Sequence, residues 1–293
     1  MTQENGRTEG TSSPAGAART AVGIALLAAL VATVYGRALA TLWLTWMTNP
    51  NYSHGYLIPP VAAFLIWRER HRFAESVGRG TVWGLLLVGL ALLAHLMSIR
   101  AGVFMTQGYS LVLLVFGVVL YLFGGRATRT VWFGIAYLVF MLPMPPFLMN
   151  VVSFQLKVFA ARVGSGIAAK MGIPLVRSGM TIHMPAGSLR IADPCSGLRS
   201  LIALVALGAL FAYLTKGPLW KRIVLFASAL PLAVIANVIR IGVLCAVANV
   251  WGVDAALGFF HDFSGVLLFL IAFAGLAVVR KLLRFEDDRK EAA

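Results

Sequence analysis

Three polar side chains stand out in an otherwise apolar chain because together they could carry out chemistry at a cysteine thiol. Cys195 lies where a polar segment gives way to a long apolar run, and Arg240 and His261 lie in later apolar runs. A thiol can attack a carbonyl, a guanidinium can hold an oxyanion, and an imidazole can move the proton. Their types therefore indicate cysteine chemistry, provided that the fold brings them together.

Cys195 is the expected nucleophile because it follows a proline at a predicted helix start. The amide dipoles there favour the thiolate, and Arg199 one turn later adds positive charge. Cys245 lies inside the apolar string Val243-Leu244-Cys245-Ala246-Val247, which is typical of inert packing. A Cys195–Cys245 disulfide is an alternative outside the cytosol, although Cys245 is expected inside its helix.

Arg240 and His261 have structural explanations beside the catalytic ones. Arg240 lies about eight residues from the expected outer end of its helix, roughly 12 Å deep at ~1.5 Å per residue. A charge in that place normally faces an interior site, but it could instead reach outward or pair with an acid such as Asp193, Asp254 or Asp262. His261, beside Asp262, could exchange protons with the thiol, or serve as an interfacial structural histidine.

The elements that must position these residues are membrane helices. The 293 residues are 59% hydrophobic and 12% charged, with a mean hydropathy of +0.84, which far exceeds the apolar content of a soluble domain. We predict an all-α, polytopic membrane helix bundle with about eight transmembrane helices, at residues 20–46, 54–67, 81–99, 109–123, 131–147, 198–215, 222–248 and 262–280.

The net charge of +14 reflects membrane topology and does not predict a nucleic-acid partner. Basic residues follow the second, fourth, sixth and last expected helices, and the turns near 48–53 and 249–261 contain none. By the positive-inside rule, both termini are cytoplasmic and the Cys195 side is extracytoplasmic. The basic residues of the 148–195 segment fit this rule less well.

Three parts of the chain are expected: a disordered cytoplasmic tail at 1–19, a membrane domain at 20–280 and a basic, charged cytoplasmic tail at 281–293. Residues 147–171 mix apolar and polar side chains and predict an amphipathic helix on the outer leaflet, the alternative being a further span. Residues 180–184 and 188–192 predict a short extracytoplasmic β-hairpin that leads to Cys195.

Four strings, in their order along the chain, resemble those of the exosortase/archaeosortase family. They are Tyr52-Ser53-His54-Gly55, Cys195-Ser196-Gly197, Asn237-Val238-Ile239-Arg240 and His261-Asp262-Phe263-Ser264-Gly265. Each string alone is weak, but the set is specific, and the first favours a bacterial exosortase. The resemblance implies a multi-pass protein of the bacterial inner membrane.

The resemblance also implies a reaction: cleavage of C-terminal sorting signals from exported proteins through a Cys195 acyl-enzyme. Such a signal consists of a short motif, often Pro-Glu-Pro, a hydrophobic helix and a basic tail. Arg240 would stabilise the oxyanion and His261 would move the proton, without a cofactor or metal. Expected partners are the tailed substrates, membrane lipids, an envelope acceptor and a separate accessory protein. The expected supporting residues are Arg199, Asp262, Asn237, Ser196, Gly197 and His54.

Other classes of protein fit parts of the pattern. A transporter could use Arg240 for an anionic substrate, with proline-broken helices as gates, and a scaffold for envelope or exopolysaccharide assembly would need only the fold. A cysteine acyltransferase acting on lipid would share the thiol but not the protein tail. A metalloprotease is disfavoured because no His-Glu-x-x-His string occurs.

Overall fold

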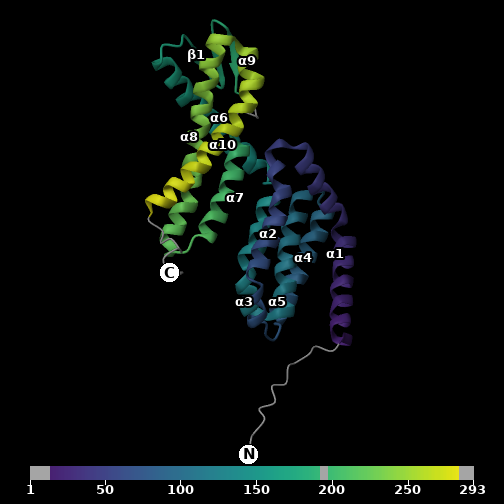
Figure 1. The fold of residues 1–293 in the computed structure, drawn as a ribbon. Coiled ribbons are helices and arrows are strands. Elements are labelled where there is room, and N and C mark those ends of the chain that lie inside the picture. Colours follow the sequence, from purple (N-terminus) through teal and green to yellow (C-terminus); the bar gives the residue numbers. More distant parts are fainter. Residues whose placement is uncertain (1–13, 192–196, 284–293) are drawn as a thin grey trace, which may run out of the picture.

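The structure is a computed structural model that describes residues 14–191 and 197–283, with side chains from residue 29 on except those of residues 259, 261 and 262. The N-terminal part is a helical bundle in which α5 contacts α1, α2, α3 and α4 (Figure 1). Its elements are α1 (Pro14–Thr48), η1 (Pro50–Leu57), α2 (Ile58–Arg68), α3 (Arg70–Ser76), α4 (Val82–Arg100), α5 (Phe104–Tyr137) and η2 (Leu138–Met141).

Two consecutive prolines begin helix α2. Pro59 and Pro60 fall in the first turn of α2, where a missing N–H leaves no intrahelical hydrogen bond unmade. The preceding turn is closed by Asn49, whose side-chain oxygen accepts a hydrogen bond from the Asn51 N–H at 3.0 Å. The α1–η1–α2 segment therefore reverses the chain in a few residues.

Helix α5 consists of two arms that meet at Gly124. This residue has φ 81° and ψ 173°, which are not helical, and a Cβ there would lie 2.5 Å from the carbonyl oxygen of Arg79. Only glycine combines that backbone conformation with so close a neighbour. The break falls between the expected helices 109–123 and 131–147, and the second arm continues through η2 to end before Pro143.

Five described helical segments are long and apolar enough to cross a membrane: Val82–Arg100, Phe104–Met141, Pro146–Lys170, Leu219–Trp251 and Phe263–Leu282. The helix Leu198–Leu214 is apolar but shorter. The chain is thus an all-α, multi-pass membrane protein. The exact count of eight spans stays a prediction. By length and composition, the two arms of α5 count as one candidate span, and α6 counts as a further one.

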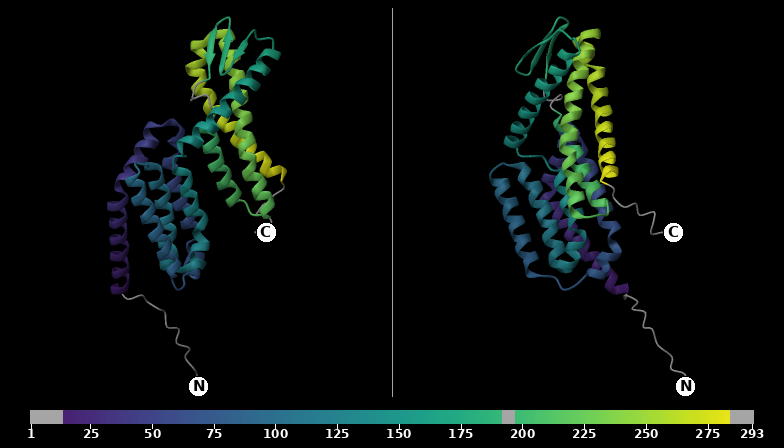
Figure 2. Two further views of the ribbon diagram at one scale, coloured as in Figure 1. Left: turned by 180° about the vertical axis from the view of Figure 1, so that it is seen from behind. Right: turned by 90° about the vertical axis from the view of Figure 1, so that its left-hand side faces the viewer.

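The C-terminal part is built around α8 (Leu219–Trp251), which contacts α6, α7, α9 and α10. Figures 1 and 2 show α9, the sheet and most of α6 rising beyond the N-terminal bundle, while α7 and the end of α10 lie lower. The bounds are α6 (Pro146–Lys170), α7 (Leu198–Leu214), α9 (Val253–Leu257) and α10 (Phe259–Leu282). The expected outward turn at 249–261 therefore contains a short helix.

Helix α6 packs closely against α8. Small residues pack it along the upper half of α8: a Cβ added to Gly164 would lie 2.8 Å from Ile241, and Ala160, Ala161 and Ala168 are buried beside it. Close helix contacts of this kind depend on small side chains. Since α6 is also long enough to span, its place on the outer leaflet stays a prediction.

The hairpin is confirmed and carries a third strand. Strands β1 (Val176–Ser178), β2 (Thr181–Met184) and β3 (Gly187–Arg190) form an antiparallel sheet in that order, with Ile182 opposite Leu189. Both of these side chains are buried against α6, α8 and α9. One face of the sheet is thereby fixed, and β3 directs the chain toward residue 192.

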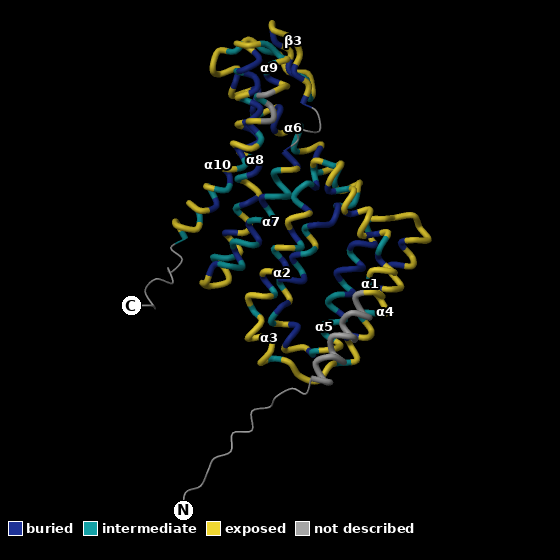
Figure 3. Tube along the Cα trace, turned by 45° about the vertical axis from the view of Figure 1, so that its right-hand side comes forward, coloured by how far each residue is buried: buried dark blue, intermediate teal, exposed yellow. Residues whose placement is uncertain are grey.

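Burial follows the helix contacts, as Figure 3 shows: buried positions line the facing sides of helices, and many outer positions are exposed. The exposed positions include large apolar side chains such as Trp43, Trp83 and Leu86, which suits a surface in contact with lipid. The chain-terminal ends of α1 and α10 point in the same direction in Figure 1, with α10 ending well above the start of α1. Which side of the membrane these ends face stays a prediction.

Candidate active site

Arg240 is a buried cation on the middle helix of the C-terminal part. Its side chain is 7% exposed, and Asn237, one turn earlier, is buried as well. Residues three apart on an α-helix share a face, and this face of α8 is turned toward α7 and α10. Because α8 continues to Trp251, Arg240 lies about 16 Å along the helix from its end, further than the expected 12 Å.

The start of α10 fixes the guanidinium of Arg240. Its Nε–H donates a hydrogen bond to Oγ of Ser264 at 3.3 Å, and Ser264 is itself buried. At the next position, Gly265, an added Cβ would lie 3.2 Å from one terminal nitrogen of Arg240. The missing side chain therefore lets the planar guanidinium approach the α10 backbone closely.

The start of α7 is fixed against the same face of α8. Gly197 is the N-cap residue of α7 and has φ 72°, in the left-handed region. A Cβ at this position would lie 2.5 Å from Cγ of Asn237. Both the conformation and the close approach require glycine. The chain thus enters α7 in contact with the Asn237–Arg240 face.

The structure describes the surroundings of the predicted catalytic set more completely than the set itself. Cys195 and Ser196 lie outside the described residues. His261 and Asp262 lie on the backbone of α10, one turn before Ser264 and Gly265, but their side chains lie outside the described ones. The described residues therefore bring together the start of α7, the Arg240 face of α8 and the start of α10. The roles of Cys195 and His261 stay predictions.

A narrow pocket lies beside Arg240 between α7, α8 and α10. Its polar lining comes from Ser200, Asn237 and Arg240, and the rest of its wall is apolar or small: Leu204, Ala233, Ala236, Gly265, Leu268, Phe269 and Ala272. A fixed guanidinium in such apolar surroundings interacts strongly with negative charge, because little water screens it. This setting suits a guanidinium that stabilises an oxyanion, while the pocket itself, at about 10 Å³, has room for no more than a water molecule.

His54 lies away from this pocket, in η1, which contacts α1, α2, η2 and α7. Neither ring nitrogen of His54 has a hydrogen-bond partner of good geometry among the described residues. Burial lowers the pKa of His54 below 6.5, and the nearby backbone of Phe140 opposes this shift more weakly. The imidazole is thus neutral at pH 7. Its support of the reaction stays a prediction, because it does not line the pocket.

Two further residues are placed clearly. Arg199 is exposed at the start of α7 and is not among the pocket-lining residues, so its expected effect on the thiol stays a prediction. Cys245 is fully buried as a free cysteine against Ile241, Leu244 and Ala248. That setting is the inert packing expected from the sequence.

Sequence reasoning missed two polar residues of the site. Ser264 lies inside the string that begins at His261, three positions later, and that spacing alone places it on the same helix face. Ser200 follows the Cys-Ser-Gly string and lines the pocket. The hydrogen bond from Arg240 to Ser264 depends on how α10 packs on α8, which no local spacing reveals.

Comparison with curated proteins and with solved structures found no match. A family model described as transmembrane exosortase matches residues 46–278. The matched region runs from the end of α1 to the last turns of α10, so it includes η1, the α7 start, the Arg240 face and the α10 start. The chain therefore belongs to the transmembrane exosortase family.

Proposed function

We propose that this exosortase is a membrane cysteine endopeptidase and transpeptidase that removes C-terminal sorting signals from exported proteins. The observation that carries the proposal is the setting of Arg240. This buried guanidinium is oriented by Ser264 and lies where the helix starts next to Cys195 and His261 in sequence meet. Burying a charge in a membrane protein is energetically costly, so a buried arginine is typical of a functional site.

The first half of the reaction is thiol acylation. His261 takes the proton of the Cys195 thiol, and the thiolate attacks the carbonyl carbon of the scissile peptide, forming a C–S bond, so that the carbonyl oxygen becomes an oxyanion near Arg240. When this intermediate collapses, the C–N bond breaks and His261 gives a proton to the leaving amine. The products are a thioester on Cys195 and the released helix with its basic tail.

The second half resolves the thioester. An amine or hydroxyl of an envelope acceptor attacks the thioester carbonyl, loses its proton to His261, and expels the Cys195 thiolate. Water in the same role would make the enzyme a protease. Transfer is favoured because a thioester at a membrane surface is positioned to meet a membrane-bound acceptor.

The nucleophile test uses the two cysteines as a matched pair. Cys195→Ala should leave the protein in the membrane and abolish release of the substrate tail, while Cys245→Ala should keep most activity because that thiol only packs. Release is followed on a substrate with motif, apolar helix and basic tail. Normal release by Cys195→Ala would remove covalent catalysis and favour a transporter or scaffold.

The product test separates the chemical outcomes. After incubation in native membranes, mass spectrometry of the new C-terminus distinguishes a free carboxylate, which means hydrolysis, from an added mass, which means transfer. His261→Ala should block acylation or stall the thioester, with Asp262→Asn milder. Acylated lipid in the absence of any tailed protein would instead identify a lipid acyltransferase.

The proposed location is the bacterial inner membrane, with Cys195 outside and both termini in the cytoplasm. A reporter fused after Arg72 or at Ala293 should be cytoplasmic, whereas one in the 249–260 segment should be extracytoplasmic. Labelling of Cys195 and Ala293 from the same side would contradict this arrangement.

A further inference from the structure

Arginines from both parts of the molecule gather at the end where α7 turns into α8. Arg68 ends α2, Arg72 lies in α3, and Arg222 lies in the first turns of α8. The charges of all three act on the hydroxyl of Tyr213, and the carboxylate of Glu69 is the one acid that does so among the described residues. We call Arg68, Arg72 and Arg222 the basic cluster.

The basic cluster lies beside a stacked pair of aromatic rings. The ring of Tyr213 stacks on Phe133 with centroids 4.0 Å apart and planes 3° apart, which joins α7 to the second arm of α5. Arg222 is held as well: its Nε–H donates to the Ala212 carbonyl at 2.7 Å, and its guanidinium carbon lies 6.0 Å from the Tyr213 ring. The positions of Tyr213 and Arg222 are therefore set by packing.

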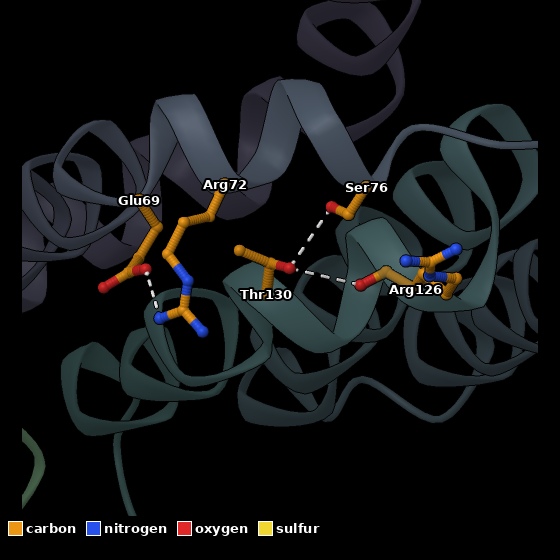
Figure 4. A network of polar contacts seen from close by, with 5 residues as sticks. All are labelled: Glu69, Arg72, Ser76, Arg126 and Thr130. Carbon is orange, nitrogen blue, oxygen red and sulfur yellow. Dashed lines mark hydrogen bonds and ion pairs between the residues drawn. The ribbon is translucent and has the colours of Figure 1, made fainter.

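The negative charge inside the cluster is too small to balance it. Glu69 pairs with Arg72 at 3.1 Å, but the Arg72 side chain remains 79% exposed (Figure 4). Figure 4 also shows how the far end of α3 is held, through Ser76 and Thr130 hydroxyls 3.2 Å apart. One carboxylate thus faces three guanidinium groups whose helices cannot easily separate, and a bound anion would relieve their repulsion.

Exposed tryptophans on both sides indicate where that anion would come from. Trp67 and Trp220 are each 58% exposed. Arg70 lies over Trp67 at 4.2 Å, and Lys221 lies 5.8 Å from the Trp220 ring. Tryptophan beside basic residues is typical of the headgroup level of a membrane.

The geometry points to a site for an anionic phospholipid: the basic cluster binds the headgroup phosphate, with guanidinium groups from both parts of the molecule as donors. Because the donors belong to α2, α3 and α8, the lipid bridges the N-terminal bundle to the α7–α8 hairpin. The inference does not depend on cysteine chemistry, so a failure of either proposal leaves the other standing.

The test uses the full-length protein in detergent and counts bound lipid by native mass spectrometry during titration with phosphatidylglycerol. Phosphatidylcholine is the zwitterionic control. The double variant Arg68→Gln/Arg72→Gln should bind phosphatidylglycerol roughly tenfold or more weakly, since each surface arginine contributes substantially to anionic lipid binding. Arg126→Gln/Arg129→Gln removes the same charge from exposed positions of α5 that do not act on Tyr213, and should bind like the wild type.

Thermal unfolding provides a second measurement. Phosphatidylglycerol should raise the melting temperature of the wild type and of Arg126→Gln/Arg129→Gln, but raise that of Arg68→Gln/Arg72→Gln much less. Equal losses in both double variants would mean a diffuse basic surface and would overturn the site. Equal binding of phosphatidylcholine, or full stabilisation by inorganic phosphate alone, would overturn the lipid assignment.

Discussion

Arg222 and Arg240 lie on the same helix and show two uses of one residue type. Arg222 donates from Nε to the Ala212 carbonyl and from a terminal nitrogen to the Tyr213 carbonyl, at 2.7 and 3.2 Å, and so satisfies the open end of α7. Arg240 donates from Nε to a side-chain hydroxyl on another helix, beside a pocket. The first contact ties the backbone together, whereas the second orients a charge.

The largest expected difference between the two arginines is in turnover. Arg240→Lys keeps the charge but loses the planar fork, so release of the substrate tail should fall by roughly 10²–10³, the cost of losing one oxyanion donor. Arg222→Lys should change turnover little. The measurement is the rate of tail release by purified enzyme, and equal rates for the two variants would show that Arg240 only balances charge.

A smaller loss is expected from crowding Arg240 without changing it. Gly265→Ala places a Cβ 3.2 Å from a terminal nitrogen of Arg240, so the guanidinium must shift by a few tenths of an ångström. We expect roughly a tenfold lower kcat, because small misplacements at a reacting centre are costly. Gly166→Ala is the matched control: it lies in α6 with nothing within 4 Å of the added Cβ. A fully active Gly265→Ala variant would show that turnover does not depend on the exact position of the Arg240 guanidinium.

Removing the hydroxyl that orients Arg240 should have a still smaller effect. Ser264→Ala is expected to lower kcat by about fivefold, in line with one modest hydrogen bond, with KM little changed. In an Arg240→Lys background the same substitution should add almost nothing, because the group that Ser264 positions is already lost. Additive losses would assign Ser264 a role independent of Arg240.

Arg222→Ala should lower stability and weaken phospholipid binding by the basic cluster, but leave the chemistry unchanged. Two α7 carbonyls lose their charged donor, so the free energy of unfolding should fall by about 1–2 kcal/mol. Thermal unfolding in detergent measures this loss, and turnover per folded molecule should stay near the wild-type value. A large loss of turnover in fully folded Arg222→Ala would erase the distinction between the two arginines.

Patterns that act along one helix were predictable from the sequence. Asn237 and Arg240 share a face because they are three residues apart, and the start of α7 at Leu198 follows from the polar string before it. The break between the two arms of α5 was expected as well, although its cause, the close approach of Gly124 to Arg79, required the packed structure.

Contacts between distant segments were not predictable in this way. The hydrogen bond between Arg240 and Ser264 and the stacking of Phe133 on Tyr213 depend on how helices cross. Strand β1 was missed because three exposed residues carry no alternating pattern. The first span was expected to begin at residue 20, but α1 begins at Pro14. An apolar run marks the stretch that can span a membrane, and the helix that contains it can begin earlier.

The distance between Arg222 and Arg240 along α8 can be compared with the thickness of a membrane. They are about 27 Å apart along the helix, close to the ~30 Å hydrocarbon core of a bilayer. In the proposed topology, Arg222 would lie at the cytoplasmic boundary and Arg240 near the opposite one, with α9 and the sheet in the water beyond it. A substrate whose apolar helix spans the same distance would present its scissile bond at that level. Cleavage would then be selected by the length of the anchor as much as by its motif, and adding two helical turns to a substrate anchor should move its scissile bond out of reach.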